Sequence, residues 1–312
     1  MGLTMPTIQT DLPEKSTRLL ERFAKALRDD DMSATTVVGY HRDVALFLRW
    51  LHDSEGDAAS IRGVTPEAIS AYRHALMHQK RLKGTTVNRR LLAVKRFFRW
   101  AVKHSKTKSN PAAETKTVRI AKRLQPKGLH RSEVQGLLRS AGLSKRHSKR
   151  NYALVQILLQ TGIRTCELVG LVVADVTLRE RSGELLVRDG KGMKQRTIPL
   201  NAAVRRGLSE YLDVRGQPSA DEPLFLTERA TAMSERTLRA TLSGLASRAH
   251  IEGPVGAHTL RHTFALNYLE AHPGQLVELA TLMGHESLDT TAVYTRPSAD
   301  DLALRLEELN VL

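Results

Sequence analysis

The sequence predicts a mainly α-helical protein with one small β-sheet, divided into an N-terminal helical bundle and a C-terminal mixed α/β domain. Three observations predict this fold. Apolar residues recur at helical spacing over most of the 312-residue chain, which is 41% hydrophobic. A short apolar run at 185–187 has the length of a strand rather than of a helix. Residues 106–127 are polar, basic and proline-marked without periodicity, which indicates a linker between two domains.

Four helices are predicted in the N-terminal half, after a flexible arm at residues 1–14. Ser33 is a suitable N-cap for the second helix. Thr65–Pro66–Glu67 provides the cap, the first-turn proline and the early acid that begin a third helix. A fourth helix begins at residues 84–86. With short loops between them, these helices predict a small bundle over residues 15–105.

The second domain is predicted to span residues 128–312. It begins with a helix capped near Ser132, followed by an apolar helix at 151–160. The stretch 183–200 indicates a β-hairpin that turns near residues 189–192, where glycines flank a lysine. Beyond it the helical pattern returns.

The charge of the chain predicts a polyanionic partner. Lys and Arg number 48 against 33 Asp and Glu, a formal net charge of +15. No acidic residue occurs from Ala68 to Ala113, and a single sign sustained over such a length suits a phosphate backbone. Aromatic residues make up only 4%, which disfavours single-strand stacking and favours duplex DNA. The residues expected to contact DNA are Arg73, Lys80, Arg81, Lys83, Arg89, Arg90, Lys95, Arg96, Arg99, Lys122 and Arg123.

Cysteine usage and hydropathy exclude several classes of protein. The single cysteine, Cys166, excludes an intramolecular disulfide and a cysteine-based metal cluster, and its apolar-rich surroundings predict a buried packing role. The N-terminal sequence has no signal pattern, and no apolar run reaches membrane-spanning length. We therefore expect a cytoplasmic protein that acts on the nucleoid and has no membrane partner.

The first chemical motifs suit a phosphate clamp and a proton donor. Arg164 lies near a predicted helix start, where the backbone favours an anion and a guanidinium can hold two phosphate oxygens. Glu167 is placed to orient Arg164 or a neighbouring base, or it is an ordinary acid in a first helical turn. Lys191, at the glycine-flanked hairpin tip, can reach into a groove and protonate a leaving oxygen. Lys194 and Arg196 are nearby basic alternatives.

The later motifs suit a second clamp and a nucleophile. His258 and Arg261 are three residues apart and share a helix face. We expect Arg261 to clamp phosphate, His258 to donate a hydrogen bond or act as a base, and His262 to provide packing support. The two histidines of HTLRH have a zinc-binding spacing, but the motif lacks the glutamate of HExxH, so no metal site is predicted. His285 precedes Tyr294 by nine residues, and clustered cations would favour ionisation of this phenol, whose ordinary pKa is about 10.

The strings TGIRTCEL, GKGMKQR, HTLRHTFA and LMGHESLDTTAVYT resemble motifs of the tyrosine recombinase (phage integrase) family, in its simple two-domain form. The resemblance covers nearly the whole chain. It implies a core-binding, SAM-like helical domain followed by the recombinase catalytic domain. It also implies site-specific recombination of double-stranded DNA through a 3′-phosphotyrosine intermediate and a Holliday junction, carried out by a homotetramer on DNA without a cofactor.

On the matched positions, the resemblance implies that Tyr294 is the nucleophile and Lys191 the general acid. It assigns stabilisation of the transition state to Arg164, Arg261 and His285. It also implies that His258 assists proton transfer and that Glu167 braces the site; His262 is expected as a supporting residue. The tail after Tyr294 has an apolar spacing that suits docking on a neighbouring protomer or folding back on its own domain. Two alternatives stay open: a type IB topoisomerase-like enzyme that relaxes DNA, and a non-catalytic DNA-binding protein.

Overall fold

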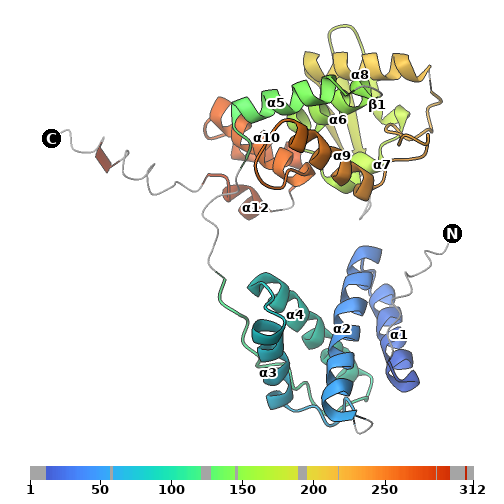
Figure 1. The fold of residues 1–312 in the computed structure, drawn as a ribbon, viewed down its shortest axis with the longest axis vertical. Helices are drawn as coiled ribbons and strands as arrows, with labels where there is room; N and C mark the ends of the chain where they lie inside the picture. The colour runs from blue at the N-terminus through green and yellow to red at the C-terminus, as the bar shows by residue number, and fades with distance from the viewer. Residues whose placement is uncertain are drawn as a thin grey trace. The chain divides into compact units, whose positions relative to one another are not determined.

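The computed structural model has two compact units, residues 1–122 and 123–312. The residues it describes are 12–56, 59–120, 128–144, 147–188, 195–216, 218–285, 287–295 and 306–307. Within these ranges the fold is mainly helical with a three-stranded sheet, which confirms the predicted fold class (Figure 1). None of the helices in these ranges is long and apolar enough to span a bilayer.

The first unit is a bundle of helices that begin where the capping signals predict. Its elements are α1 (Glu14–Asp29), α2 (Ala34–Glu55), α3 (Pro66–His74), the π-helix η2 (Ala75–Gln79) and α4 (Gly84–Lys103). Ser33 caps α2 by accepting from the backbone N–H of Thr36 at 3.3 Å, and Thr65 caps α3 by accepting from Ala68. The π-helical turn that extends α3 has no signal in the sequence.

Aromatic side chains from four helices form the core of this bundle. The Phe23 ring of α1 meets the Phe97 ring of α4 edge-on, with centroids 5.3 Å apart. Phe47 of α2 contacts Phe98 of α4 at 5.9 Å and Tyr72 of α3 at 5.1 Å, again near right angles. Such edge-to-face pairs each add about 0.5–1.5 kcal/mol to the free energy of burial. The core therefore fixes α4 against α1 and α2 and leaves one face of α4 exposed.

The second unit packs helices around a central helix and carries the sheet at one side. Its elements are α5 (Arg131–Gly142), α6 (Ser148–Thr161), α7 (Thr165–Gly170), η3 (Val173–Asp175), β1 (Val176–Leu178), β2 (Gly183–Arg188), β3 (Gln195–Pro199), α8 (Ala202–Arg215), α9 (Glu235–Arg248), α10 (Ala257–Ala271), α11 (Leu276–Met283) and α12 (Leu288–Ala292).

The sheet is antiparallel in the order β1-β2-β3. Strands β2 and β3 form the predicted hairpin ladder, with Leu185 opposite Ile198 and Arg188 opposite Gln195. The turn between them falls outside the described residues. The short strand β1, which pairs with β2 from Val176 to Leu178, was not predicted because three residues carry too little periodicity.

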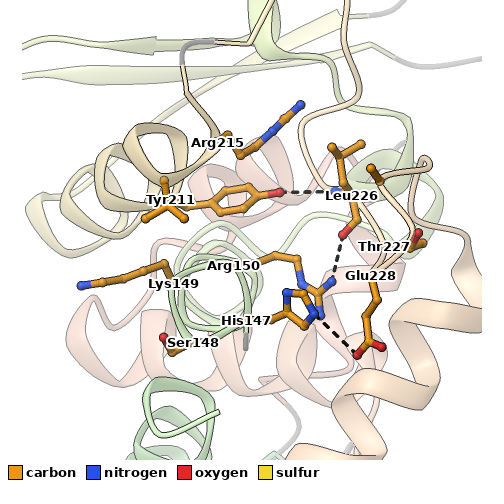
Figure 2. Close-up of a pocket in the computed structure, with 11 residues that line it drawn as sticks. His147, Ser148, Lys149, Arg150, Tyr211, Arg215, Leu226, Thr227 and Glu228 are labelled. Carbon is orange, nitrogen blue, oxygen red and sulfur yellow. Dashed lines mark hydrogen bonds and ion pairs between the residues drawn. The ribbon is translucent and has the colours of Figure 1, made fainter. Parts of the chain in front are cut away.

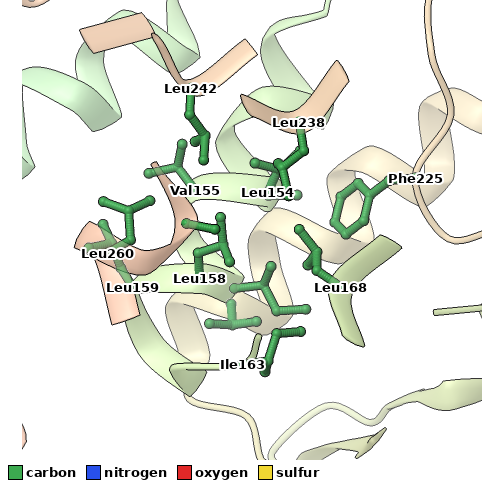
Figure 3. Packing of buried hydrophobic residues seen from close by; sticks show 14 of the residues in the cluster. Leu154, Val155, Leu158, Leu159, Ile163, Leu168, Phe225, Leu238, Leu242 and Leu260 are labelled. Carbon is green, nitrogen blue, oxygen red and sulfur yellow. The ribbon is translucent and has the colours of Figure 1, made fainter. Parts of the chain in front are cut away.

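Helix α6 is buried on nearly all sides and is the centre of this unit (Figure 3). Leu154 and Leu158 of α6 pack with Leu238 and Leu242 of α9 in the same apolar cluster. A helix that is apolar all round belongs in a core rather than at a surface. Since α6 is fixed by this packing, the residues that follow it are held in place as well.

The N-terminal cap of α5 differs from the prediction. The N-cap residue is His130, not Ser132, and the carboxylate of Glu133 accepts the His130 backbone N–H at 2.7 Å. Glu133 thus serves as the acid at the third helical position of this cap.

Candidate active site

Arg164 is positioned by the sharp end of α6. Gly162 ends that helix in the left-handed region at φ 60°, and a Cβ at this position would overlap the Phe264 ring. Arg164 follows as the N-cap of α7, as the position of the glycine predicted. Its guanidinium donates to Glu167 Oε1 at 2.9 Å and to the carbonyl oxygen of Gly284 at 2.6 Å. The side chain is thereby tied to segments on both sides of the site.

Glu167 joins two arginines rather than serving only as a first-turn acid. Besides the bond from Arg164, its carboxylate accepts hydrogen bonds from both terminal nitrogens of Arg196 on β3, from Nη1 to Oε1 at 2.9 Å and from Nη2 to Oε2 at 2.8 Å. Burial raises the pKa of this carboxyl, but the hydrogen bonds and charges of Arg196 and Arg164 outweigh burial and lower the pKa to about 2. Glu167 is therefore ionised at any physiological pH. It orients both Arg164 and the neighbouring Arg196.

Arg261 reaches the same place from α10 and is almost completely buried. Its guanidinium donates to the carbonyl oxygens of Gly162 and Met283 and contacts the Nε2 atom of His285 at 2.8 Å. Burial and the neighbouring charge of Arg164 lower its pKa to about 10, which still leaves it charged at neutral pH. A buried guanidinium held by carbonyl oxygens keeps its full positive charge available to an anion.

The tautomer of His285 follows from its partners. An arginine N–H can only donate, so Nε2 of His285 accepts from Arg261 and the ring proton lies on Nδ1. Nδ1 then donates to Thr291 Oγ1 at 2.6 Å. Burial, then the charges of Arg261 and Arg164, lower the pKa of His285 to about 4, so the ring is neutral. In this geometry His285 fixes the orientation of Arg261.

Gly284 allows this close approach of α11 to the arginines. It ends α11 in the left-handed region at φ 64°. A Cβ at this position would lie 2.6 Å from an Nη1 atom of Arg196, so any other residue would displace the guanidinium. The glycine of LMGH is thus a structural part of the cluster.

Tyr294 lies just beyond α12, which Ser287 caps by accepting from Asp289 N at 3.2 Å. The tyrosine is 7% exposed and packs in an apolar cluster with Phe264 and Met283. Its hydroxyl is 2.6 Å from Nδ1 of His262. Burial raises the pKa of the phenol, and the charge of Arg261 opposes this rise. The hydroxyl is therefore protonated in the protein without DNA.

The two histidines of HTLRH are arranged differently from each other. His262, expected only to pack, makes the contact with Tyr294 Oη, whereas the His258 ring meets the His262 ring edge-on at a centroid distance of 4.1 Å. Burial, then the charges of His258 and Arg261, lower the pKa of His262 to about 4. Burial and Arg261 also lower the pKa of His258. The sequence signal for His262 was its position next to Arg261, one turn after His258.

The electrostatic balance of the cluster is strongly positive. Three guanidinium groups, those of Arg164, Arg196 and Arg261, surround one carboxylate, that of Glu167. The histidines beside them are neutral, so among the described side chains of the site two positive charges remain without a carboxylate. A buried excess of positive charge binds an anion such as a phosphodiester. In the described ranges no three His, Cys, Asp or Glu side chains are grouped to hold a metal ion.

Several predicted residues lie outside the described residues. They are Lys191 and Lys194 of the hairpin turn and Lys122 and Arg123 of the linker. Strand β2 ends at Arg188, and β3 begins at Gln195. The prediction for Cys166 is wrong: this residue is exposed, because it lies on the outer side of the short helix α7, whose buried residue is Leu168.

The basic residues of α4 are divided between two sides of the helix. Arg99 is exposed, and Arg89 and Arg96 lie on the same outer face, where they pair with Asp43 and Asp30. Arg90 differs from the expected exposed position: it lines a cavity of about 410 Å³ beside Tyr72. Of the other residues expected to contact DNA, Lys80, Arg81 and Lys83 are exposed, Lys95 is partly exposed and donates to Ala113 O at 3.0 Å, and Arg73 is half-buried.

A cavity elsewhere in the second unit has no part in this cluster (Figure 2). It encloses about 370 Å³ between the start of α6, the end of α8 and the loop at 226–230. Its polar groups bond to one another: Arg150 donates to Leu226 O at 3.0 Å, and His147 pairs with Glu228 at 3.7 Å. None of the predicted site residues lines it, so the chemistry belongs to the arginine cluster.

Comparisons with known proteins match both units. The model of the phage integrase family matches residues 127–300, and that of the phage integrase N-terminal SAM-like domain matches residues 20–105. The tyrosine recombinase XerD of Ralstonia nicotianae is 32% identical over 297 residues, which cover 93% of either chain. The crystal structure of XerA recombinase is 28% identical with a TM-score of 0.52, covering 95% of this chain and 99% of that one. The crystal structure of XerH bound to its difH substrate before cleavage is 23% identical with a TM-score of 0.71. The match covers 95% of this chain and 84% of that one.

Proposed function

The chain belongs to the phage integrase family of tyrosine recombinases, and we propose that it recombines DNA site-specifically through a covalent bond between Tyr294 and a DNA 3′ phosphate. The observation that carries the proposal is the convergence of Tyr294, Arg261, His285 and Arg164 from separate segments of the second unit. Cleavage of a phosphodiester by a side chain needs this combination, since the charge on the pentavalent phosphate must be offset while the nucleophile is aimed.

Each described side chain has a proposed task in the cleavage step. Arg164 and Arg261 hold the non-bridging oxygens of the scissile phosphate, and His285 keeps Arg261 in place. Tyr294 Oη attacks phosphorus, and the leaving 5′ oxygen takes a proton from Lys191. The energy of the broken bond is kept in the tyrosine–phosphate bond, so rejoining needs no nucleotide cofactor.

Strand exchange reverses the same step with a different strand. The 5′ hydroxyl of a partner strand attacks the phosphotyrosine and releases Tyr294. We propose that four protomers hold two duplexes and exchange strands in pairs through a Holliday junction. The XerH structure is a pre-cleavage complex with its substrate, and duplex DNA is the substrate we propose for this chain.

The first unit is proposed to hold the DNA by its backbone. The outer face of α4 carries Arg89, Arg96 and Arg99, and the loop before it carries further exposed cations. Contacts of this kind give affinity and register without reading bases. We propose residues 15–105 as this DNA-binding domain, 106–127 as a basic linker, and 128–312 as the catalytic domain with its docking tail.

A suicide substrate tests the proposal. A duplex nicked just beside the cleavage point loses its short 5′-hydroxyl fragment after attack, which traps the enzyme on the DNA. Wild-type protein is expected to give a complex that survives denaturation, and Tyr294→Phe to give none while still shifting the duplex in a native gel. A covalent complex that persists in Tyr294→Phe contradicts the assignment. Efficient relaxation of a supercoiled plasmid without a target site would favour a topoisomerase instead.

A further inference from the structure

We infer that His262, and not His258, accepts the proton of Tyr294 during attack on the phosphate. This inference rests on the proposed function, because it assigns a partner to the nucleophile of that reaction. The contact that carries it is the distance of 2.6 Å between Nδ1 of His262 and Oη of Tyr294. His262 touches the reacting oxygen itself, and this distance is within the range required of a general base.

The direction of this hydrogen bond follows from the two groups. An imidazole nitrogen is a much stronger acceptor than a phenol oxygen, and a phenol is the stronger donor. Tyr294 therefore donates to Nδ1, and the proton of the neutral His262 ring lies on Nε2. This is the arrangement that a proton transfer from the phenol requires.

The protein holds both partners so that the contact is fixed. Tyr294 is buried in the cluster with Phe264 and Met283, and its backbone N–H donates to Thr291 O at 3.0 Å. His262 is on α10, next to the buried Arg261, and the His258 ring packs edge-on against the His262 ring. His258 has the role of supporting the His262 ring.

The charged groups around His262 keep it neutral until DNA is present. His258 and Arg261 on its own helix, together with burial, lower its pKa to about 4, and Tyr294 faces it from the segment after α12. A phosphodiester held by Arg261 brings negative charge close to the ring and raises its pKa toward the working pH. The base thus gains strength when the scissile phosphate is in place.

The Oη–H bond of Tyr294 breaks and its proton moves to Nδ1 of His262. The Oη–P bond forms, the P–O5′ bond breaks, and O5′ takes a proton from Lys191, the proposed general acid. On rejoining, the incoming 5′ hydroxyl returns its proton to Lys191 while protonated His262 gives its proton back to the released phenolate.

Single-turnover cleavage of two substrates at saturating DNA tests the inference. One has the ordinary 5′ oxygen, and the other has a 5′-bridging sulfur, a leaving group that needs no proton. His262→Phe keeps a flat ring but no acceptor, and we expect it to slow cleavage about 10²–10⁴-fold on both substrates. The difference in cleavage rate between His262→Phe and wild type should become smaller as pH rises toward the phenol pKa, since hydroxide then removes the Tyr294 proton in place of His262. His262→Asn keeps an acceptor at the position of Nδ1 but takes no proton, and we expect a similar loss.

The control is His272→Phe, at the residue that follows the last turn of α10. The His272 ring contacts the Tyr268 ring at a centroid distance of 4.9 Å and lies outside the arginine cluster, so its replacement should leave the cleavage rate unchanged. Native-gel binding and thermal unfolding show whether each variant is folded. Wild-type rates in His262→Phe, full recovery in His262→Asn, or recovery on the sulfur substrate would each overturn the inference. Absence of covalent complex in wild type on any substrate would instead refute the proposed function.

Discussion

The two units use arginine in opposite ways. On α4 of the first unit, Arg89 and Arg96 pair with two different carboxylates, those of Asp43 and Asp30, and remain partly open to solvent. In the second unit Arg164, Arg196 and Arg261 share a single buried carboxylate. The first arrangement gives a basic surface that attracts a polyanion. The second leaves an excess of buried positive charge, which a bound anion would neutralise.

This difference shows that composition indicates a basic surface but does not locate a reaction site. The acid-free stretch from Ala68 to Ala113 is visible in the sequence, yet its arginines pair with acids from α1 and α2. The reaction site depends on the meeting of segments more than 100 residues apart, as in the bond from Arg164 to Gly284 O.

The largest difference between the two units is expected in the cleavage rate when an arginine is replaced by lysine. Arg261→Lys retains a charge but loses the fork that holds Gly162 O, Met283 O and His285, so cleavage at saturating DNA should fall about 10²–10³-fold. Arg96→Lys, on the exposed face of α4, should cleave within about twofold of wild type. The measurement is the first-order rate of covalent complex formation. Equal losses in the two variants would show that the units do not differ in this way.

The next effect concerns the shared carboxylate. Glu167→Gln removes one partner of a buried ionic cluster and should lower the free energy of unfolding at pH 7 by about 3 kcal/mol, measured by urea unfolding. The exposed Asp30→Asn should cost less than about 1 kcal/mol. Comparable losses in the free energy of unfolding for Glu167→Gln and Asp30→Asn would show that the buried and the exposed carboxylate do not differ in this way.

The pH dependence of Glu167 follows from its lowered pKa. The folded pKa of about 2 is below the ordinary 4.5, so the ionised carboxylate stabilises the fold fully above about pH 4.5. This contribution is lost as pH falls from there toward 2. Wild type should therefore lose more stability than Glu167→Gln over this window. Equal losses of stability in wild type and Glu167→Gln over this pH range would show that the arginines do not stabilise the ionised carboxylate.

A smaller effect separates two arginines of α4. Arg99→Gln should weaken duplex binding and reduce the slope of log affinity against log salt by about 1, without changing stability. Arg89→Gln removes an ionic partner of the buried Asp43 and should cost about 1–3 kcal/mol of stability. Anisotropy of a labelled duplex over a salt series, with urea unfolding, measures both. An unchanged salt slope in Arg99→Gln would remove the outer face of α4 from the interface.

The smallest expected effect is that of Cys166→Ser. Cys166 is exposed and lies between Arg164 and Glu167 in sequence, but its side chain is not part of their hydrogen bonds. Cleavage rate and melting temperature should match wild type within error. A loss of tenfold or more would place this side chain on the DNA.

Local signals in the sequence were sufficient for most elements of the fold. Ser33 and Thr65 cap helices as predicted, and Gly162 ends α6, because caps and left-handed turns depend on a few adjacent residues. The strand β1 and the π-helical turn η2 were missed, since each depends on tertiary packing. Cys166 was misassigned because an apolar neighbourhood in sequence does not tell which side of a short helix faces the core.

For the candidate site, motif order predicted which residues to examine but not how they pair. The bond between Arg196 and Glu167 joins β3 to α7, and no spacing in the sequence indicates it. Likewise, the sequence placed His258 and His262 on one helix but could not show which of them faces Tyr294. Such choices depend on side-chain directions set by the packing of α10 against α6 and α11.

The measurement that tests the central claim most directly is mass spectrometry of the trapped complex after nuclease and protease digestion. The account predicts a residual nucleotide bonded through phosphate to Tyr294. A nucleotide on Tyr268 or on a serine or threonine of the 287–295 segment would contradict it.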